Sequence, residues 1–285
     1  MRLGERTLVM GIINVTPDSF AGGGAYLDPE RALDVALALE ADGADILDVG
    51  GESTRPGAEP LSSANERARV IPVLKRLTTR IKVPISVDTY KADVAREALN
   101  EGAAIINDVS SLHYDPGLAR VAAVAGVPLV LMHNRGRSRD MYETASYNDV
   151  VGDIRHELAS TVEQAMAAGV SRDQIIVDPG LGFAKRASQT FAALARLGAL
   201  STLDRPVLVG PSRKSFLQDA LGNLPPDERE WGTAAAVTAA ILGGAHIVRV
   251  HGVREMMQVT RVADHVRAYS DDVMSAAPAV SYVSG

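Results

Sequence analysis

Cysteine is absent from this sequence of 285 residues, and aromatic residues make up only 4% of it. Without cysteine the chain has no disulfide framework, no thiolate nucleophile and no cysteine-based zinc site. The scarcity of aromatic side chains disfavours an aromatic-rich β-sandwich. The abundance of Ala, Val, Leu and Ile favours instead a core of branched aliphatic residues.

Long apolar runs are also missing. The start of the chain is short and polar, and residues 8–13 are too few for the apolar region of a secretory signal or for a membrane span. The net charge of −6 argues against a nucleic-acid surface, which needs a basic face. It permits an anionic small substrate, because a binding site depends on local charge. We therefore expect a cytoplasmic protein that binds small molecules and neither nucleic acid nor a membrane.

What is present is a recurring pattern: a short apolar run, a polar or glycine-bearing loop, and an amphipathic stretch. The apolar runs are rich in Val, Ile and Leu and show little alternation, as expected of parallel strands that are buried on both faces. These runs lie at residues 8–13, 46–49, 84–87, 104–106, 128–132, 174–177, 206–209 and 247–250.

Helical character fills the intervals between the apolar runs. Helices are predicted at residues 31–41, 63–79, 91–100, 115–125, 149–168, 189–200, 213–221, 233–242 and 254–269. Ser63 and Glu66 have the spacing of a capping box at the start of the second helix. The long loops at 15–28 and 51–62 follow the first two strands, and we expect them to act as mobile lids over an active site.

Eight strand–helix units without a linker predict a (β/α)8 TIM barrel that forms a single domain over residues 1–270. The alternative is a doubly wound sheet, which would bind its ligand at one switch point. Polar residues follow every strand here, and this favours the barrel. Residues 271–285 are small, polar and without pattern, so we expect a disordered C-terminal tail.

Barrel enzymes build their active sites from the side chains that follow the strands. In this sequence those side chains include Asn14, Glu52, Asp88, Asn107, His133, Asp178, Ser212, Lys214, Arg249 and His251. A single aspartate at such a position usually caps a loop, and a pair of carboxylates would suit a glycosidase. Three groups together, Asp88, Asn107 and Asp178, favour a pocket that reads the donor edge of a flat heterocycle carrying NH and NH2 groups.

Arg249 and His251 lie two residues apart on one predicted strand, so their side chains point to the same side. Closure of the barrel brings Asn14 beside them. A guanidinium, an imidazole and an amide that converge predict a phosphate or oxyanion site, to which Asn14 could add a divalent ion. The open alternative is that Arg249 is the structural partner of a buried carboxylate. Lys214 and Ser215, at the start of a predicted helix, could hold a second anionic group.

Eight segments, one at each strand end, carry a resemblance to a known family. They are residues 11–20 (GIINVTPDSF), 48–57 (DVGGESTRPG), 85–89 (ISVDT), 106–109 (INDV), 132–133 (MH), 178–183 (DPGLGF), 212–216 (SRKSF) and 249–251 (RVH). Each motif alone is a weak signal, but the eight in this order resemble the dihydropteroate synthase family over residues 8–270. The resemblance implies a (β/α)8-barrel transferase of folate biosynthesis that is a target of sulfonamides.

The resemblance also implies the reaction: 7,8-dihydropterin-6-ylmethyl diphosphate and 4-aminobenzoate give 7,8-dihydropteroate and pyrophosphate, with Mg²⁺ as cofactor. By this resemblance the pterin-binding residues are Asp88, Asn107, Val109, Met132, Asp178 and Lys214. The diphosphate-binding residues are Asn14, Arg249 and His251, with Asn14 linked to Mg²⁺. The residues around 4-aminobenzoate are Thr54, Arg55, Pro56, Phe183 and Ser215. The catalytic residues are Asp88, Lys214, Arg249 and His251. The family further implies a homodimer formed through the late helices.

Two other functions stay open at this point. A pterin-binding methyltransferase module would share the pterin-binding residues, but it would need neither the anion site at Arg249 and His251 nor the aminobenzoate loop. A catalytically silent paralogue would bind pterin without condensing it. Both the anion site and the loops are intact in this sequence, which favours the synthase.

Overall fold

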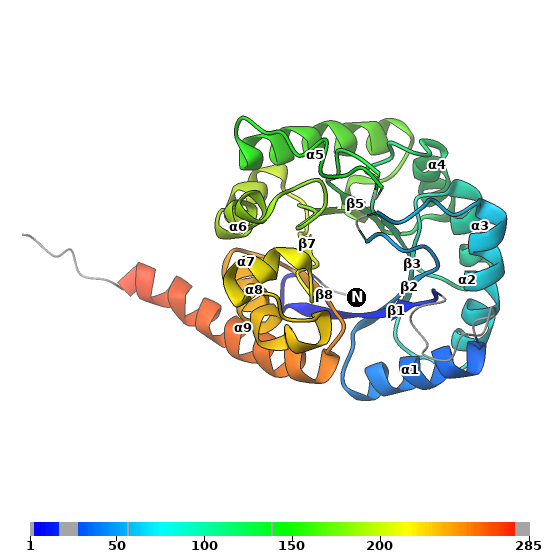
Figure 1. Ribbon diagram of the computed structural model, residues 1–285, viewed down its shortest axis with the longest axis horizontal. Coiled ribbons are helices and arrows are strands. Elements are labelled where there is room, and N and C mark those ends of the chain that lie inside the picture. The colour runs from blue at the N-terminus through cyan, green and yellow to red at the C-terminus, as the bar shows by residue number, and fades with distance from the viewer. Residues whose placement is uncertain (1–2, 17–27, 56, 138, 277–285) are drawn as a thin grey trace, which may run out of the picture.

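The computed structural model describes residues 3–16, 28–55, 57–137 and 139–276, and its helices form an outer ring around the strands (Figure 1). The strands are β1 Leu8–Asn14, β2 Ile46–Gly50, β3 Ile85–Asp88, β4 Ile105–Asp108, β5 Leu129–Met132, β6 Ile175–Asp178, β7 Leu208–Val209 and β8 Ile247–Val250. The α-helices are α1 Pro29–Ala41, α2 Ser63–Leu77, α3 Ala92–Asn100, α4 Gly117–Ala125, α5 Val150–Ala167, α6 Ala187–Ala195, α7 Gln218–Leu221, α8 Glu230–Leu242 and α9 Val253–Ala276. The 3-10 turns are η1 Arg172–Gln174, η2 Leu197–Leu203, η3 Ser215–Leu217 and η4 Pro226–Glu228.

The strands form one parallel sheet of eight in the order β6-β5-β4-β3-β2-β1-β8-β7. A parallel bridge between Val177 and Val207 joins the two outer strands of that order and closes the sheet on itself. The predicted (β/α)8 TIM barrel is therefore confirmed. Because all strands run the same way, their carboxyl ends meet at one mouth of the barrel.

Two apolar layers hold the barrel together. The larger one lies between the outer face of the sheet and the helix ring, and it includes Val9, Leu47, Val87 and Ile106. The smaller one fills the barrel interior, and its members are Leu8, Met10, Ile46, Ile105, Val130, Ile176, Leu208 and Ile247. Successive residues of a strand alternate between these two layers, which explains why the strands are apolar without alternation.

Several predicted helix boundaries are wrong. Helix α2 is capped by Ser62, whose side chain accepts a hydrogen bond from the backbone N–H of Asn65, so the predicted capping box of Ser63 and Glu66 does not form. Ser63 instead donates to Asp93 of α3 at 2.9 Å. The helix predicted at 189–200 is divided between α6 and the turn η2, and the one predicted at 213–221 is a short turn, η3, followed by α7.

The predicted C-terminal tail begins too early. Helix α9 continues to Ala276, so residues 271–276 are helical, while 277–285 lie outside the described residues. The sequence explains the extension, since residues 270–276 contain neither glycine nor proline and the first proline beyond the helix is Pro278.

The two long loops that were predicted to act as lids are described to different extents. Residues 17–27 of the first lie outside the described residues. In the second, Arg69 of α2 donates to the Gly51 carbonyl at 2.9 Å, and the Tyr90 hydroxyl donates to Glu52 at 2.7 Å. The base of the second loop is therefore attached to the barrel wall.

Candidate active site

A polar layer lies directly above the apolar interior of the barrel. Counting two residues along each strand from an interior apolar residue reaches the next side chain that points inward. These steps run from Ile46 to Asp48, from Ile105 to Asn107, from Val130 to Met132, from Ile176 to Asp178 and from Ile247 to Arg249. Strand alternation thus places charged groups from different strands in one ring at the mouth of the barrel.

Arg249 joins two carboxylates across this ring. Its Nε donates to Asp48 at 2.6 Å and its Nη2 to Asp88 at 2.8 Å. Asn107 donates its amide hydrogen to the same Asp48 oxygen at 3.0 Å. The sequence-based alternative, in which Arg249 pairs with a buried carboxylate, is therefore realised in the structure.

Burial and the neighbouring opposite charges act in opposite directions on the pKa values of Asp88 and Arg249. Burial raises the pKa of Asp88 to about 7, with the nearby Arg249 acting in the opposite direction and Asp48 adding to the rise. The pKa of Arg249 stays above its usual value because Asp48 and Asp88 outweigh the effect of burial. Asp48 is fully buried, and its Oδ1 has no hydrogen-bond partner among the described residues. A ligand that donates hydrogen bonds would satisfy such a site.

Asp178 and Lys214 form the other side of the ring. Asp178 accepts a hydrogen bond from the Gly180 N–H at 2.7 Å, and burial raises its pKa although Lys214 opposes the rise. Lys214 donates to the Leu181 carbonyl at 2.5 Å and lies 4.4 Å from the centre of the Phe183 ring. Burial lowers the pKa of Lys214 to about 8. The predicted neighbours Asp178, Phe183 and Lys214 thus come together.

His251 occupies a corner of positive potential. Its Nδ1 lies 2.9 Å from the Ser212 hydroxyl, which also accepts a hydrogen bond from the His251 backbone N–H at 3.2 Å. Burial, followed by the charges of Arg249, Arg213, Arg55 and Lys214, lowers the pKa of His251 to about 3. The imidazole is therefore neutral at neutral pH, with one hydrogen on its two ring nitrogens. When the Ser212 hydroxyl donates to Nδ1, that hydrogen lies on Nε2 and can be donated to an anion.

The remaining predicted residues surround this ring. Asn14, Gly50, Asp88 and Asn107 are register partners across β1 to β4, so they lie in one row, and the Asp88 side chain lies 3.4 Å from the position that a Cβ on Gly50 would take. Val109 and Met132 are buried. Thr54 is partly exposed and Arg55 is exposed in the second loop, and Pro56 lies outside the described residues.

Ser215 differs from its prediction in one respect. It begins a 3-10 turn of three residues rather than an α-helix, and its hydroxyl lies 3.4 Å from the Tyr142 hydroxyl. The turn lacks the aligned peptide dipoles of a long helix, so Ser215 offers hydrogen-bond donors with little macrodipole behind them.

Sequence reasoning missed two groups of this region. Asp48 has a sequence signal that could have identified it, since it is a lone carboxylate within the apolar run 46–49 and on the inward side of the strand. Lys185 gives no such signal, because a lysine after a βα loop is normally exposed, whereas here it is 1% exposed.

A closed (β/α)8 barrel with a ring of buried carboxylate, amide and guanidinium groups at its carboxyl-end mouth defines an enzyme that binds a small polar ligand there. Comparison with known proteins then narrows the class. The family model described as pterin binding enzyme matches residues 10–251. The chain belongs to this family, and within it to the dihydropteroate synthases.

Relatives and solved structures agree on this assignment. The chain is 49% identical over 260 residues to the dihydropteroate synthase of Bacillus subtilis, covering 91% of this chain and 88% of the relative. The structure of the Clostridium difficile dihydropteroate synthase in the presence of pteroic acid superposes with a TM-score of 0.88 at 41% identity, covering 93% of this chain and 98% of that one. The Xanthomonas albilineans synthase with 4-aminobenzoic acid has a TM-score of 0.87 at 41% identity, covering 93% and 94%. The resemblance stated from the motifs is confirmed.

None of the helices in the described part of the chain is long and apolar enough to cross a membrane. The same residues contain no group of three or more His, Asp or Glu side chains that could hold a metal ion by themselves.

Proposed function

We propose that this chain is a transferase that condenses 7,8-dihydropterin-6-ylmethyl diphosphate with 4-aminobenzoate, giving 7,8-dihydropteroate and pyrophosphate in folate biosynthesis. The observation that carries the proposal is the ring in which Arg249, bound to Asp48 and Asp88, faces Asn107 and Asp178 above the apolar interior. The family membership supports it.

The hydrogen-bond acceptors at the mouth of the barrel suit the pterin heterocycle. Asp88, Asn107 and Asp178 offer carboxylate and amide oxygens to the NH and NH2 groups of the heterocycle. The buried side chains of Val109 and Met132 would pack on its faces. Lys214, beside Asp178, would donate to a ring acceptor. Asp88 would in addition stabilise positive charge on the ring when the leaving group departs.

The diphosphate suits the corner that contains Arg249, His251 and Asn14. Two of the three Arg249 nitrogens are occupied by Asp48 and Asp88, while Nη1 has no hydrogen-bond partner within the described residues and can donate to a phosphate oxygen. His251 would donate through Nε2–H. The positive potential that lowers the pKa of His251 attracts the anion.

Mg²⁺ fits this corner as a proposed cofactor. The Asn14 side chain makes no hydrogen bond to any described residue, so its amide oxygen is available as a ligand. A single protein oxygen is sufficient, since Mg²⁺ usually keeps several waters and binds substrate phosphates. When bound, the ion would neutralise charge on the leaving pyrophosphate.

The chemistry then requires positioning and charge stabilisation. The bond between the pterin methylene carbon and the diphosphate oxygen breaks, and pyrophosphate leaves against Arg249 and His251. The aniline nitrogen of 4-aminobenzoate attacks the cationic methylene and then loses a proton to solvent. No protein nucleophile is needed. The groups proposed to act on the reacting atoms are Asp88, Lys214, Arg249 and His251.

The second substrate would lie between the second loop and the end of the barrel. Thr54, Arg55, Pro56, Phe183 and Ser215 are proposed to surround 4-aminobenzoate. Ser215 would donate to its carboxylate, and the Phe183 ring, which already carries Lys214 on one face, would stack on the substrate ring. The long loops at 15–28 and 51–62 would exclude water, which otherwise competes for the cation.

The test is pyrophosphate release by the purified protein with the pterin diphosphate and Mg²⁺, measured with and without 4-aminobenzoate. We expect release in step with the formation of 7,8-dihydropteroate when both substrates are present. Tight pterin binding without release or product would reject the synthase reaction and indicate a pterin-binding protein.

The same proposal includes a homodimer formed through α8 and α9. Five large apolar side chains of these helices are at least 48% exposed: Trp231, Leu242, Val262, Val266 and Tyr269. Apolar side chains gathered on neighbouring helices are typical of a surface that a second copy covers. A cytoplasmic location is likewise proposed, and fractionation of the source cells would test it.

A further inference from the structure

Lys185 is a buried lysine that the proposed reaction does not use. It lies at the end of the loop between β6 and α6, and its side chain is 1% exposed. Its Nζ lies 2.8 Å from His133 Nδ1, 2.9 Å from the Phe183 carbonyl, 3.0 Å from the Gly180 carbonyl and 3.4 Å from the His133 carbonyl. Four acceptors around one amine demand a donor-rich group, and lysine is the side chain that supplies three hydrogens from one atom.

The contact with His133 fixes the state of that imidazole. Because the amine donates to Nδ1, this ring nitrogen carries no hydrogen, and Nε2–H donates to Glu157 at 3.0 Å. Burial, followed by the charge of Lys185, lowers the pKa of His133 to about 4, so the ring is neutral. Burial acts to raise the pKa of Glu157, but hydrogen bonds from His133 and Arg135 outweigh it and lower the pKa to about 2.

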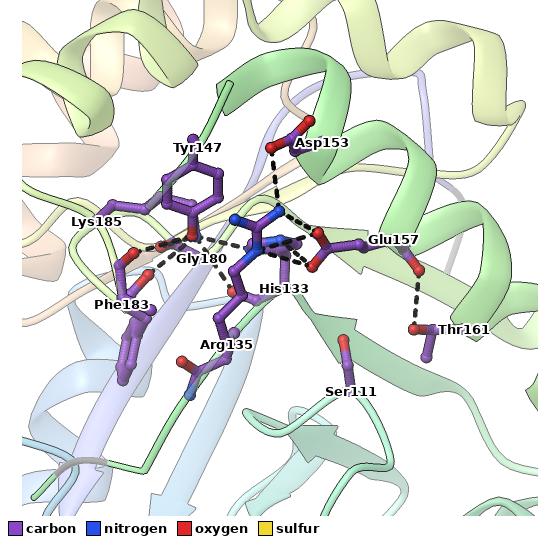
Figure 2. Close-up of polar contacts among 12 residues, drawn as sticks. Ser111, His133, Arg135, Tyr147, Asp153, Glu157, Thr161, Gly180, Phe183 and Lys185 are labelled. Atoms are coloured by element: carbon purple, nitrogen blue, oxygen red, sulfur yellow. Dashed lines mark hydrogen bonds and ion pairs between the residues drawn. The ribbon is translucent and has the colours of Figure 1, made fainter. Parts of the chain in front are cut away.

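A second layer of contacts surrounds this chain of groups (Figure 2). Arg135 binds Glu157 and, at 3.1 Å, Asp153 of the same helix α5. The Arg135 guanidinium lies 4.0 Å from the centre of the Tyr147 ring. The Tyr147 hydroxyl donates to the Ala184 carbonyl at 2.9 Å, next to Lys185. The β6–α6 loop is thus held by hydrogen bonds from its own Lys185 and from Tyr147, which lies outside the loop.

The loop that Lys185 binds carries two of the substrate-binding residues. The Gly180 N–H donates to Asp178, while the Gly180 carbonyl accepts from Lys185. Phe183 is held through its carbonyl, and its ring faces Lys214. The loop also presses on the end of β5, since a Cβ built on Gly180 would lie 2.0 Å from the His133 carbonyl oxygen. A shift of this loop would therefore move Asp178 and Phe183 together.

We propose that Lys185 is a positioning residue for both substrates: its side-chain nitrogen, in contact with His133 and with the Gly180 and Phe183 carbonyls, fixes the β6–α6 loop so that Asp178 and Phe183 hold their places. The three shortest of these contacts all lie within 3.0 Å. Burial lowers the pKa of Lys185 well below its usual value, while the negative charges of Asp178 and Glu157 act in the opposite direction. This inference rests on the proposed function, because it assigns Asp178 to the pterin and Phe183 to 4-aminobenzoate.

The test is Lys185→Met, which preserves the length of the side chain and removes its donors. We expect the dissociation constant for 6-hydroxymethylpterin, measured by calorimetry, and the KM for 4-aminobenzoate each to rise about tenfold, since a buried network loses its donor. The control is Leu118→Ala, a cavity in α4 on the helix side of the sheet. It should lower the melting temperature while leaving both constants unchanged within about twofold. Wild-type constants in a folded Lys185→Met protein would overturn the proposal.

A milder pair of variants covers the case in which Lys185→Met does not fold. Tyr147→Phe removes only the hydrogen bond to Ala184, and Glu157→Gln removes the charge that holds His133 and Arg135. Each should raise the KM for 4-aminobenzoate about two- to threefold with a smaller effect on kcat. An unchanged KM in both variants would also overturn the proposal.

The experiment separates this inference from the proposed function. If the wild-type protein does not bind 6-hydroxymethylpterin, the proposed function fails whatever Lys185 does. If the wild type binds it and Lys185→Met binds it equally well, only the role of Lys185 fails.

Discussion

At the scale of single residues, the negative charge of Asp48 is important for the structure of the site. It is fully buried, it accepts from Arg249 and Asn107, and it stands between β1 and β3. Removing one member of a buried ion pair leaves the other charge without compensation, which costs more than the pair contributes when intact. The residue therefore governs both the stability of the barrel mouth and the orientation of Arg249.

We predict that Asp48→Asn lowers the free energy of unfolding by about 3 kcal/mol. Ser86→Ala is the matched control, because Ser86 is the register partner of Asp48, is equally buried and has no hydrogen-bond partner for its hydroxyl among the described residues. It should cost less than about 1 kcal/mol. Urea unfolding of the three proteins measures both values. Equal losses in the two variants would contradict the assigned weight of the Arg249–Asp48 pair.

The pH dependence of the reaction follows from Asp88. Its pKa of about 7 means that the carboxylate gains a proton as the pH falls through 7, so its negative charge is present above that pH and lost below it. Since the charged form is proposed to stabilise the cationic intermediate, kcat/KM for the pterin diphosphate should fall below about pH 7. Asp88→Asn should be slow and should lack this acid limb. If the wild-type kcat/KM varies by less than about twofold between pH 6 and 8, this role of Asp88 is refuted.

At the scale of elements, the β6–α6 loop depends on a glycine. Gly180 has φ +65, and any side chain there would collide with the His133 carbonyl. Gly126, which ends α4, has nearly the same φ of +67 but its nearest atom, Gln174 Nε2, is 3.8 Å from a built Cβ. The two glycines share the backbone conformation but differ in the room that is available for a side chain.

We predict that Gly126→Ala costs about 1 kcal/mol of stability, the usual cost of a left-handed conformation for alanine. Gly180→Ala should cost more than about 3 kcal/mol, because the backbone must also move away from β5. Thermal unfolding compares the variants. Similar melting temperatures would show that the loop is not pressed against β5 as described.

The elements also show where sequence reasoning succeeds and where it stops. Strand positions were predictable, because apolar runs of Val, Ile and Leu between glycine-bearing loops have few other structures open to them. The cap of α2 was not, since Ser62 and Ser63 are both suitable caps and only the pairing of Ser63 with Asp93 of α3 decides between them. Such a contact depends on the packing of two helices.

The site shows the same division. The places of Asp88, Asn107 and Asp178 at the mouth of the barrel were predictable, because the strand ends of a barrel are fixed by the fold. The pairing of Arg249 with Asp48 and Asp88 joins residues that are 201 and 161 positions apart, so no local pattern reveals it. Lys185 was missed for a related reason, because its burial depends on four acceptors brought together by two different loops.

At the scale of the whole molecule, the exposed face of α8 and α9 predicts assembly. Trp231→Asp should shift the protein from dimer to monomer in sedimentation, because a charge at an 87% exposed tryptophan would be buried by a second copy. Val124→Asp is the control, since Val124 is 73% exposed on α4, across the barrel from α8 and α9 (Figure 1). A Trp231→Asp protein that sediments as the wild type would exclude this face as the interface.

The closure of the barrel has a consequence for its motions. β6 and β7 are joined by the single bridge of Val177 and Val207, whereas β1 and β2 share five register pairs. The loops after these two strands carry Phe183 and Lys214, which touch each other across the seam. We therefore expect the Val177 amide to exchange with deuterium sooner than the amides of β1 and β2. A ligand that contacts both loops would hold β6 and β7 together and slow the exchange of the Val177 amide.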